Sequence, residues 1–131
     1  MTLSVYFLLV CLSTAQTQNE WLSADELRQE MSNISLFGTV EGLIWQECIT
    51  ADGQTQYTLE NTQPEIGRLN ITDDALACFN YGAQDACFRV QRRGDNYAFY
   101  MSTALDLDNT LVFVTHKVKR GVKLCSAEDV S

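Results

Sequence analysis

Short segments in which apolar and polar residues alternate make up most of this chain, and this pattern is typical of half-buried β-strands. In residues 97–102, for example, Tyr97, Phe99 and Met101 alternate with Ala98 and Tyr100. The strands predicted in this way cover residues 35–41, 43–50, 54–60, 66–71, 76–81, 86–92, 97–102 and 110–118. An antiparallel meander of about seven or eight such strands is enough to form a small barrel or a strongly curved sheet.

Turn-forming residues separate these segments. Asp52-Gly53 predicts a hairpin, because both central positions of a tight turn favour positive φ. Asp73-Asp74 predicts another turn, Gly38 predicts a bend or bulge, and residues 106–109 predict a polar loop before the last strand.

One helix is predicted before the first strand. Ser23 and Glu26 have the spacing of a capping box, and Leu22, Leu27 and Met31 form an apolar stripe. We expect this helix to cover one open end of the sheet. The predicted fold class is therefore mainly β, with one N-terminal helix.

The N-terminus has the features of a secretory signal peptide. Residues 3–12 are apolar but too few to span a bilayer, which needs about 20 residues. The small residues Ser13-Thr14-Ala15 then supply a cleavage site. We therefore expect a signal peptide at 1–15, a single domain at 16–131 and no transmembrane segment. A lipid anchor at Cys11 is a minority alternative, because Val10 is not the small residue expected before an acylated cysteine.

Four cysteines remain behind this signal peptide: Cys48, Cys78, Cys87 and Cys125. An even number in an exported chain predicts a disulfide framework, and three pairings are open. Local geometry favours Cys78–Cys87 across neighbouring strands, which leaves Cys48–Cys125. Zinc is disfavoured, because the chain has no C-x2-C pair and His116 is its one histidine.

The charge of the chain excludes one class of partner. Nine basic and 17 acidic residues give a net charge of −8, which argues against nucleic-acid binding. Basic residues gather late in the chain, where they predict either a patch for an acidic partner or, more commonly, a protected strand edge. They are Arg89, Arg92, Arg93, Lys117, Lys119, Arg120 and Lys123.

No catalytic, metal-binding or cofactor-binding set stands out. His116 lies within a predicted strand and has no serine-presenting turn near it, so we interpret it as a surface residue. Asp52, Asp73-Asp74 and Glu47 are interpreted as turn-forming or solubilising carboxylates. Residues 106–109 offer alternating oxygen ligands for a weak calcium site, but they lack the glycine and glutamate of an EF-hand loop.

Aromatic residues recur along the predicted strands. A closed sheet could use some of them to line a small apolar cavity, but we expect them mainly to fill the core. They are Trp45, Tyr57, Phe79, Tyr81, Phe88, Tyr97, Phe99 and Tyr100.

Several short motifs resemble those of small secreted proteins of unknown function from alphaproteobacteria. They lie between residues 22 and 101 and comprise Leu22-Ser-Ala-Asp-Glu-Leu27, Gly38-Thr-Val40, Trp45-Gln-Glu47, Asp52-Gly53, Gly67-x-Leu69-x-Ile71, Asp73-Asp-x-Leu76-x-Cys78, Cys87-Phe-x-Val90 and Arg93-Gly-Asp-x-Tyr97. The resemblance implies a periplasmic or secreted β-protein and no particular activity.

The expected function is that of an exported, non-enzymatic binding or interaction module whose partner is an unidentified protein or small ligand. Two alternatives remain within that class: a barrel that binds a small ligand, and an inhibitor of an exported enzyme such as lysozyme. A third alternative is a cell-wall hydrolase that uses two carboxylates.

Overall fold

The computed structural model describes residues 20–103, 106–121 and 125. Its elements are β1 (Glu20–Trp21), α1 (Ala24–Glu30), β2 (Ile34–Val40), β3 (Leu43–Ile49), β4 (Gln54–Leu59), β5 (Glu65–Ile71), β6 (Ala77–Asn80), β7 (Asp85–Arg93), β8 (Asn96–Thr103) and β9 (Asp106–Arg120). The predicted signal peptide and Cys11 lie outside the described residues.

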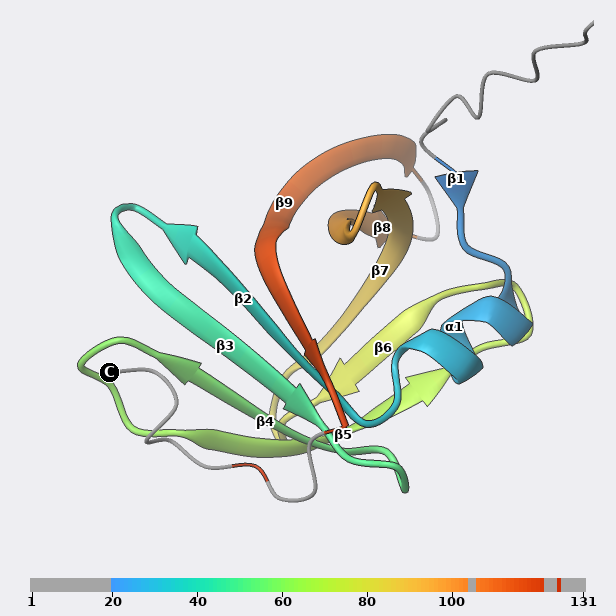
Figure 1. Cartoon of the computed structure of the whole chain (residues 1–131). Helices are drawn as coiled ribbons and strands as arrows, with labels where there is room; N and C mark the ends of the chain where they lie inside the picture. Colours follow the sequence, from blue (N-terminus) through green and yellow to red (C-terminus); the bar gives the residue numbers. More distant parts are fainter. Residues whose placement is uncertain (1–19, 104–105, 122–124, 126–131) are drawn as a thin grey trace, which may run out of the picture.

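Eight antiparallel strands close into a barrel (Figure 1). Each strand from β2 to β8 pairs with the next along the chain, and β9 returns to pair with β2. The short strand β1 pairs with Gln91 and Arg92 of β7, beyond the part of β7 that pairs with β6. The meander predicted from the sequence is therefore confirmed, and of the two shapes left open the closed barrel is the one that forms.

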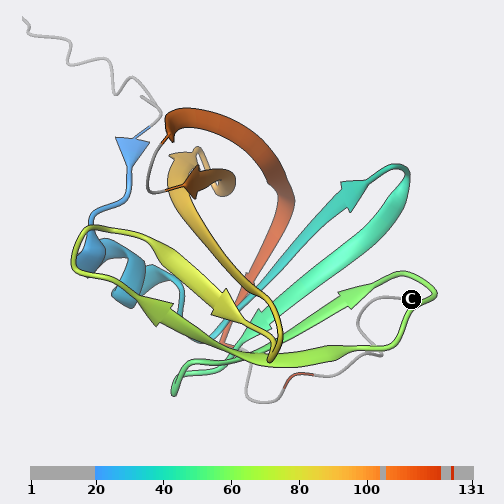
Figure 2. The ribbon, with the colours of Figure 1, turned by 180° about the vertical axis from the view of Figure 1, so that it is seen from behind.

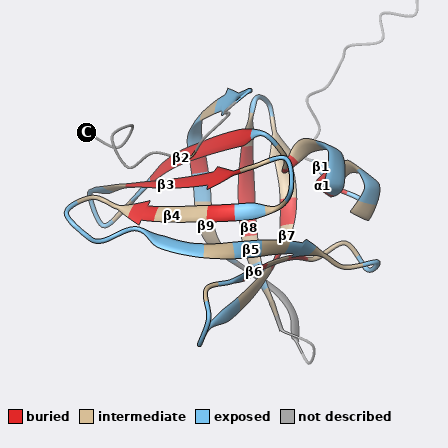
Figure 3. Ribbon diagram, turned by 90° about the horizontal axis from the view of Figure 1, so that it is seen from below, coloured by how far each residue is buried: buried red, intermediate tan, exposed pale blue. Residues whose placement is uncertain are grey.

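Helix α1 covers one end of the barrel, opposite the β2–β3 and β4–β5 turns (Figures 1 and 3). Its predicted capping box is confirmed: the Ser23 hydroxyl accepts from the Glu26 amide, and the Glu26 carboxylate accepts from the Ser23 amide. Figure 2 shows the helix beside the β5–β6 turn, where Arg28 bonds to Asp73 at 2.9 Å. The buried Leu27 points into the core from this helix.

Arg92, on β7, joins the helix to this end of the barrel. Its half-buried guanidinium bonds to three carboxylates: Glu20 and Glu26, each at 3.2 Å, and Glu30. Arg120 donates to the main-chain carbonyl of Glu30 at 3.2 Å. Arg92 and Arg120 therefore hold α1 against the barrel. The prediction of a protected strand edge is wrong for Arg92, which is paired on both sides, by β1 and by β8. Lys117 and Lys119 lie on a part of β9 that pairs with β2 alone among the described strands.

Two disulfides hold the fold together. Cys78 and Cys87 lie directly opposite each other on β6 and β7 and are bonded. Cys48 on β3 is bonded to Cys125, 77 positions further along the chain. These are the two pairs favoured by the predicted strand neighbours.

Local departures from the predicted elements have simple causes. The bulge predicted at Gly38 is confirmed by a register shift against β9. The Asp52-Gly53 hairpin forms, but its turn is longer than the tight turn predicted. Gly53 is the one residue of this turn with positive φ, and the Gly53 amide donates to the Thr50 carbonyl at 3.2 Å. The loop predicted at residues 106–109 is wrong: these residues begin the long strand β9.

Candidate functional site

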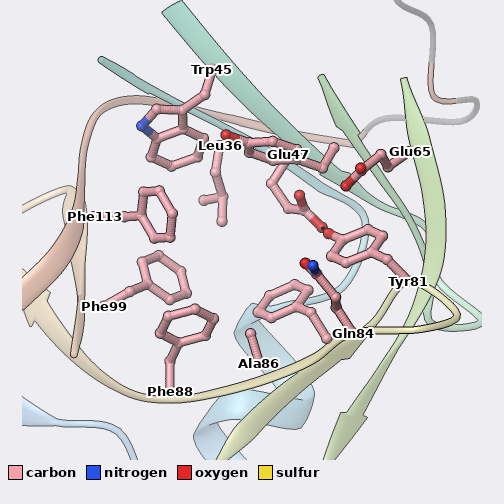
Figure 4. Close-up of a pocket in the computed structure, with 12 residues that line it drawn as sticks. Leu36, Trp45, Glu47, Glu65, Tyr81, Gln84, Ala86, Phe88, Phe99 and Phe113 are labelled. Carbon is pink, nitrogen blue, oxygen red and sulfur yellow. Dashed lines mark hydrogen bonds between the residues drawn. The ribbon is translucent and has the colours of Figure 1, made fainter. Parts of the chain in front are cut away.

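The barrel encloses a cavity of about 230 Å³, called here the barrel cavity (Figure 4). Seven of its twelve lining residues are aromatic. Two lining residues, Glu65 and Gln84, are exposed. They mark the mouth, at the end of the barrel that α1 does not cover. The full lining comprises Leu36, Trp45, Glu47, Tyr57, Glu65, Phe79, Tyr81, Gln84, Ala86, Phe88, Phe99 and Phe113.

Strand register explains why two carboxylates enter this cavity. Leu36 lies opposite Glu47, Glu47 opposite Tyr57, and Tyr57 opposite Glu65, on the four strands from β2 to β5. Residues directly opposite each other in a sheet project from the same face. Because Leu36 points into the barrel core, Glu47, Tyr57 and Glu65 must point inward as well.

An aromatic wall forms the apolar side of the cavity. Phe88 makes edge-to-face contacts with Phe99 and Phe113, at centroid distances of 6.0 and 5.9 Å. Trp45 makes the same kind of contact with Phe113 at 5.4 Å. The indole of Trp45 lies against Gly38, where an added Cβ would be 2.5 Å from the ring. A glycine at position 38 is therefore what allows the indole to lie at the cavity wall.

Glu47 forms the centre of the polar side. Its side chain is buried, with only 6% of the residue exposed, and the Tyr81 hydroxyl donates a hydrogen bond to its Oε1 atom. Burial raises the pKa of Glu47 from 4.5 to about 8, although the bond from Tyr81 favours the ionised form; the negative charge of Glu65 adds to the rise. Glu47 is therefore mostly protonated at neutral pH.

The two tyrosines beside Glu47 remain neutral phenols. Burial, followed by the neighbouring charge of Glu47, raises the pKa of Tyr81 well above its usual range. Burial raises the pKa of Tyr57 as well, again with Glu47 and Glu65 contributing. Figure 4 shows Glu47, Tyr81 and Gln84 on one side of the cavity and Phe88, Phe99 and Phe113 on the other. The site is thus amphipathic, with a polar corner facing an aromatic wall.

The aromatic residues named from the sequence divide among three places. Six of the eight line the cavity. Four of these six are also buried in the hydrophobic core, as expected, so the same rings fill the core and form the cavity wall: Trp45, Phe79, Phe88 and Phe99. Tyr97 lies at the closed end and donates to Glu30 at 2.9 Å. Tyr100 lies on the outer surface against Trp21, at a centroid distance of 5.0 Å. Phe113 is a seventh aromatic lining residue that was not named from the sequence. It lies between Val112 and Val114, so no alternation with polar residues indicates which way its side chain points.

The other candidate residues lie apart from the cavity. His116 is exposed on β9, and Asp52 and Asp73 are exposed in turns. Hydrogen bonds from Thr50 and from the Gln54 amide lower the pKa of Asp52, as expected of a turn-forming carboxylate. The side chains of residues 106–109 lie outside those the structure describes. Within the described part of the chain, no three His, Cys, Asp or Glu residues come together as metal ligands.

Glu47 and Glu65 are the two carboxylates of the cavity. The interpretation of Glu47 as a turn-forming or solubilising carboxylate is wrong, because its side chain is buried inside the barrel, and Glu65 was not named as a candidate. Trp45 and Ile49 are apolar and lie two positions on either side of Glu47, which places Glu47 on their face of the strand. Ile44 and Cys48, on the opposite face of the same strand, are apolar as well, so the sequence does not show which face points into the barrel. Figure 3 shows the reason: β3 is buried along most of its length.

Fold and site together define the chain as a disulfide-bonded, eight-stranded antiparallel barrel with an N-terminal helix and an amphipathic internal cavity. Comparisons with protein-family models, curated proteins and solved structures each find no match. Among the described residues, no helix is long and apolar enough to cross a membrane.

Proposed function

We propose that this protein is a non-enzymatic binding module that holds one small, largely apolar molecule inside its barrel. The observation that carries the proposal is the barrel cavity itself, about 230 Å³ in volume and walled by seven aromatic side chains. The interior of an eight-stranded barrel is either filled by side chains or wide enough to hold one small ligand, and the cavity here corresponds to the second case. The volume lies below the roughly 300–1,000 Å³ of sites for drug-sized molecules, so the ligand is a smaller one.

The two sides of the cavity have different tasks in this proposal. The aromatic wall supplies affinity, since each buried CH2 group contributes about 0.8 kcal/mol. The corner formed by Glu47, Tyr81 and Gln84 orients the ligand by hydrogen bonding, as the few polar groups of an apolar site usually do. The ligand enters past Glu65 and Gln84, the exposed residues of the lining.

Glycoside hydrolysis has less support. Glu47 and Glu65 do line one cavity, and two carboxylates are the minimal set for that chemistry. However, Glu65 is exposed at the mouth while Glu47 is buried, and Tyr57 lies between them in the strand register. We therefore favour binding over hydrolysis.

The proposed location is the periplasm or the extracellular medium. Two disulfides point to an oxidising compartment, because reducing cytosols keep such cysteines as thiols. The proposed signal peptide at 1–15 agrees with this location.

Filling the cavity tests the proposed function. Ala86 lines the cavity opposite Phe79, so Ala86→Phe places a ring inside it. We expect the substitution to weaken binding of small aromatic probes at least about tenfold, a loss of about 1.4 kcal/mol. The probes are 2-phenylethanol, 2-phenylethylamine and phenylacetate, and binding is followed by tryptophan emission. A Trp21→Phe background leaves Trp45, in the cavity wall, as the one tryptophan.

Ala51→Phe is the matched control, because Ala51 is exposed in the β3–β4 turn, away from the cavity. This variant should bind like the parent. The proposed function is contradicted if none of the three probes changes the emission of Trp45, or if Ala86→Phe and Ala51→Phe bind them equally well.

A further inference from the structure

The polar corner of the barrel cavity contains acidic groups and no basic ones. Among the described lining residues, Glu47 and Glu65 are carboxylic acids and none is Lys, Arg or His. The remaining polar groups of the lining are the Tyr57 and Tyr81 hydroxyls, the Gln84 amide and the indole N–H of Trp45, which is buried without a hydrogen-bond partner among the described residues. A ligand carboxylate or phosphate placed here would face two carboxyl groups without a counterion, and burying an unpaired anion is costly.

A positively charged group would find several favourable partners at the same place. The rings of Tyr57 and Tyr81 lie 6.4 Å apart, centroid to centroid, and both neighbour the Glu47 carboxyl. Cations are attracted to aromatic faces within about 6 Å of the centroid, most strongly where water is excluded. The net charge of −8 also raises the local concentration of cations around the molecule.

We propose that the ligand of the barrel cavity is a small organic cation, namely an ammonium group on an apolar, preferably aromatic, body. This inference rests on the proposed function and names its ligand class. The ammonium group bonds to Glu47 beside the rings of Tyr57 and Tyr81. The apolar body lies against Phe88, Phe99 and Phe113, and Glu65 at the mouth attracts the cation on entry.

The protonation of Glu47 links this binding to pH. The titratable groups that face Glu47 are Tyr81 from β6, Tyr57 from β4 and Glu65 from β5. A bound cation stabilises the ionised carboxylate, so the protein must release a proton from Glu47 when it binds below the pKa of about 8. Affinity for a cation should therefore increase between pH 6 and pH 8, by up to about tenfold per pH unit.

Three probes that share one body but differ in charge test the inference. In the Trp21→Phe protein at pH 8, we expect 2-phenylethylamine to bind about tenfold or more tighter than 2-phenylethanol, corresponding to the strength of one buried cation–aromatic contact. Phenylacetate should bind most weakly. Glu47→Gln keeps the shape of the side chain and should bring the amine and the alcohol within about twofold of each other. The same variant should remove the increase in amine affinity between pH 6 and pH 8.

Glu65→Gln is the second variant, because Glu65 is exposed at the mouth and its charge makes the smallest contribution to the raised pKa of Glu47. Glu65→Gln should lower the affinity for the amine less than Glu47→Gln does. If the alcohol or the carboxylate binds as tightly as the amine, and Ala86→Phe still blocks it, the cation inference is overturned while the proposed function stands. If none of the probes binds, both are overturned.

Discussion

The protein should lose about 3 kcal/mol of its free energy of unfolding when the pH is raised from 5 to 8, because of Glu47 alone. Its pKa is about 8 in the folded protein, against an ordinary value of 4.5. Between these values the folded state binds more protons than the unfolded state, so raising the pH favours unfolding, by up to about 1.4 kcal/mol per pH unit. Below pH 4.5 both states are protonated and above pH 8 both are ionised, so the loss is confined to this window.

Urea unfolding of the parent and of Glu47→Gln, at pH 5 and at pH 8, isolates this contribution. All other groups titrate in both proteins, so the difference between the two pH dependences belongs to Glu47. Between pH 5 and pH 8, the free energy of unfolding of the variant should fall by about 3 kcal/mol less than that of the parent. Glu65→Gln is the matched control, and it should retain the steep dependence of the parent. Parallel pH dependences in the parent and Glu47→Gln would show that Glu47 is not buried in the barrel.

Removing the Cys48–Cys125 disulfide should cost more stability than removing Cys78–Cys87. The first bond closes a loop across a sequence separation of 77, and the second closes one of 9. Because a cross-link reduces the entropy of the unfolded chain more when its loop is longer, the expected losses are about 4.5 and about 2.7 kcal/mol. A loss of about 4.5 kcal/mol is a large part of the 5–15 kcal/mol typical of a domain.

The two double variants, Cys48→Ala with Cys125→Ala and Cys78→Ala with Cys87→Ala, serve as controls for each other. Urea unfolding at pH 5, where Glu47 is protonated in the folded state, keeps the two contributions separate. Equal losses, or a larger loss for the short loop, would contradict the loop-entropy argument and indicate that local strain or packing dominates.

Much of the fold could be predicted from the sequence, because local patterns determine it. The Ser23–Glu26 capping box, the Asp52-Gly53 hairpin and the alternation around Phe99 are each readable over a few residues. Closure of the barrel was not readable, because it depends on pairing between β2 and β9, which lie about 80 positions apart in the chain. Strand β1 is only two residues long and carries no periodic pattern.

The site was harder to predict, because the raised pKa of Glu47 results from its burial in the folded barrel. In the sequence, Glu47 is one of 17 acidic residues, and its apolar neighbours Trp45 and Ile49 do not place it inside, because the other face of the same strand is equally apolar. It becomes distinctive once the register places it between Leu36 and Tyr57 inside a closed barrel. The same holds for Arg92, one of several basic residues late in the chain, whose three carboxylate partners come from β1 and α1.

Intermolecular NOEs between bound 2-phenylethylamine and the isotope-labelled protein test the central claim most directly. We expect the ring protons of the ligand to give NOEs to Phe99 and Phe113, and its methylene protons next to nitrogen to give NOEs to Tyr81. These contacts would place the apolar body on the aromatic wall and the ammonium group beside Glu47. NOEs to Trp21 and Tyr100 on the outer surface, with none to Phe99 or Phe113, would contradict a ligand site inside the barrel.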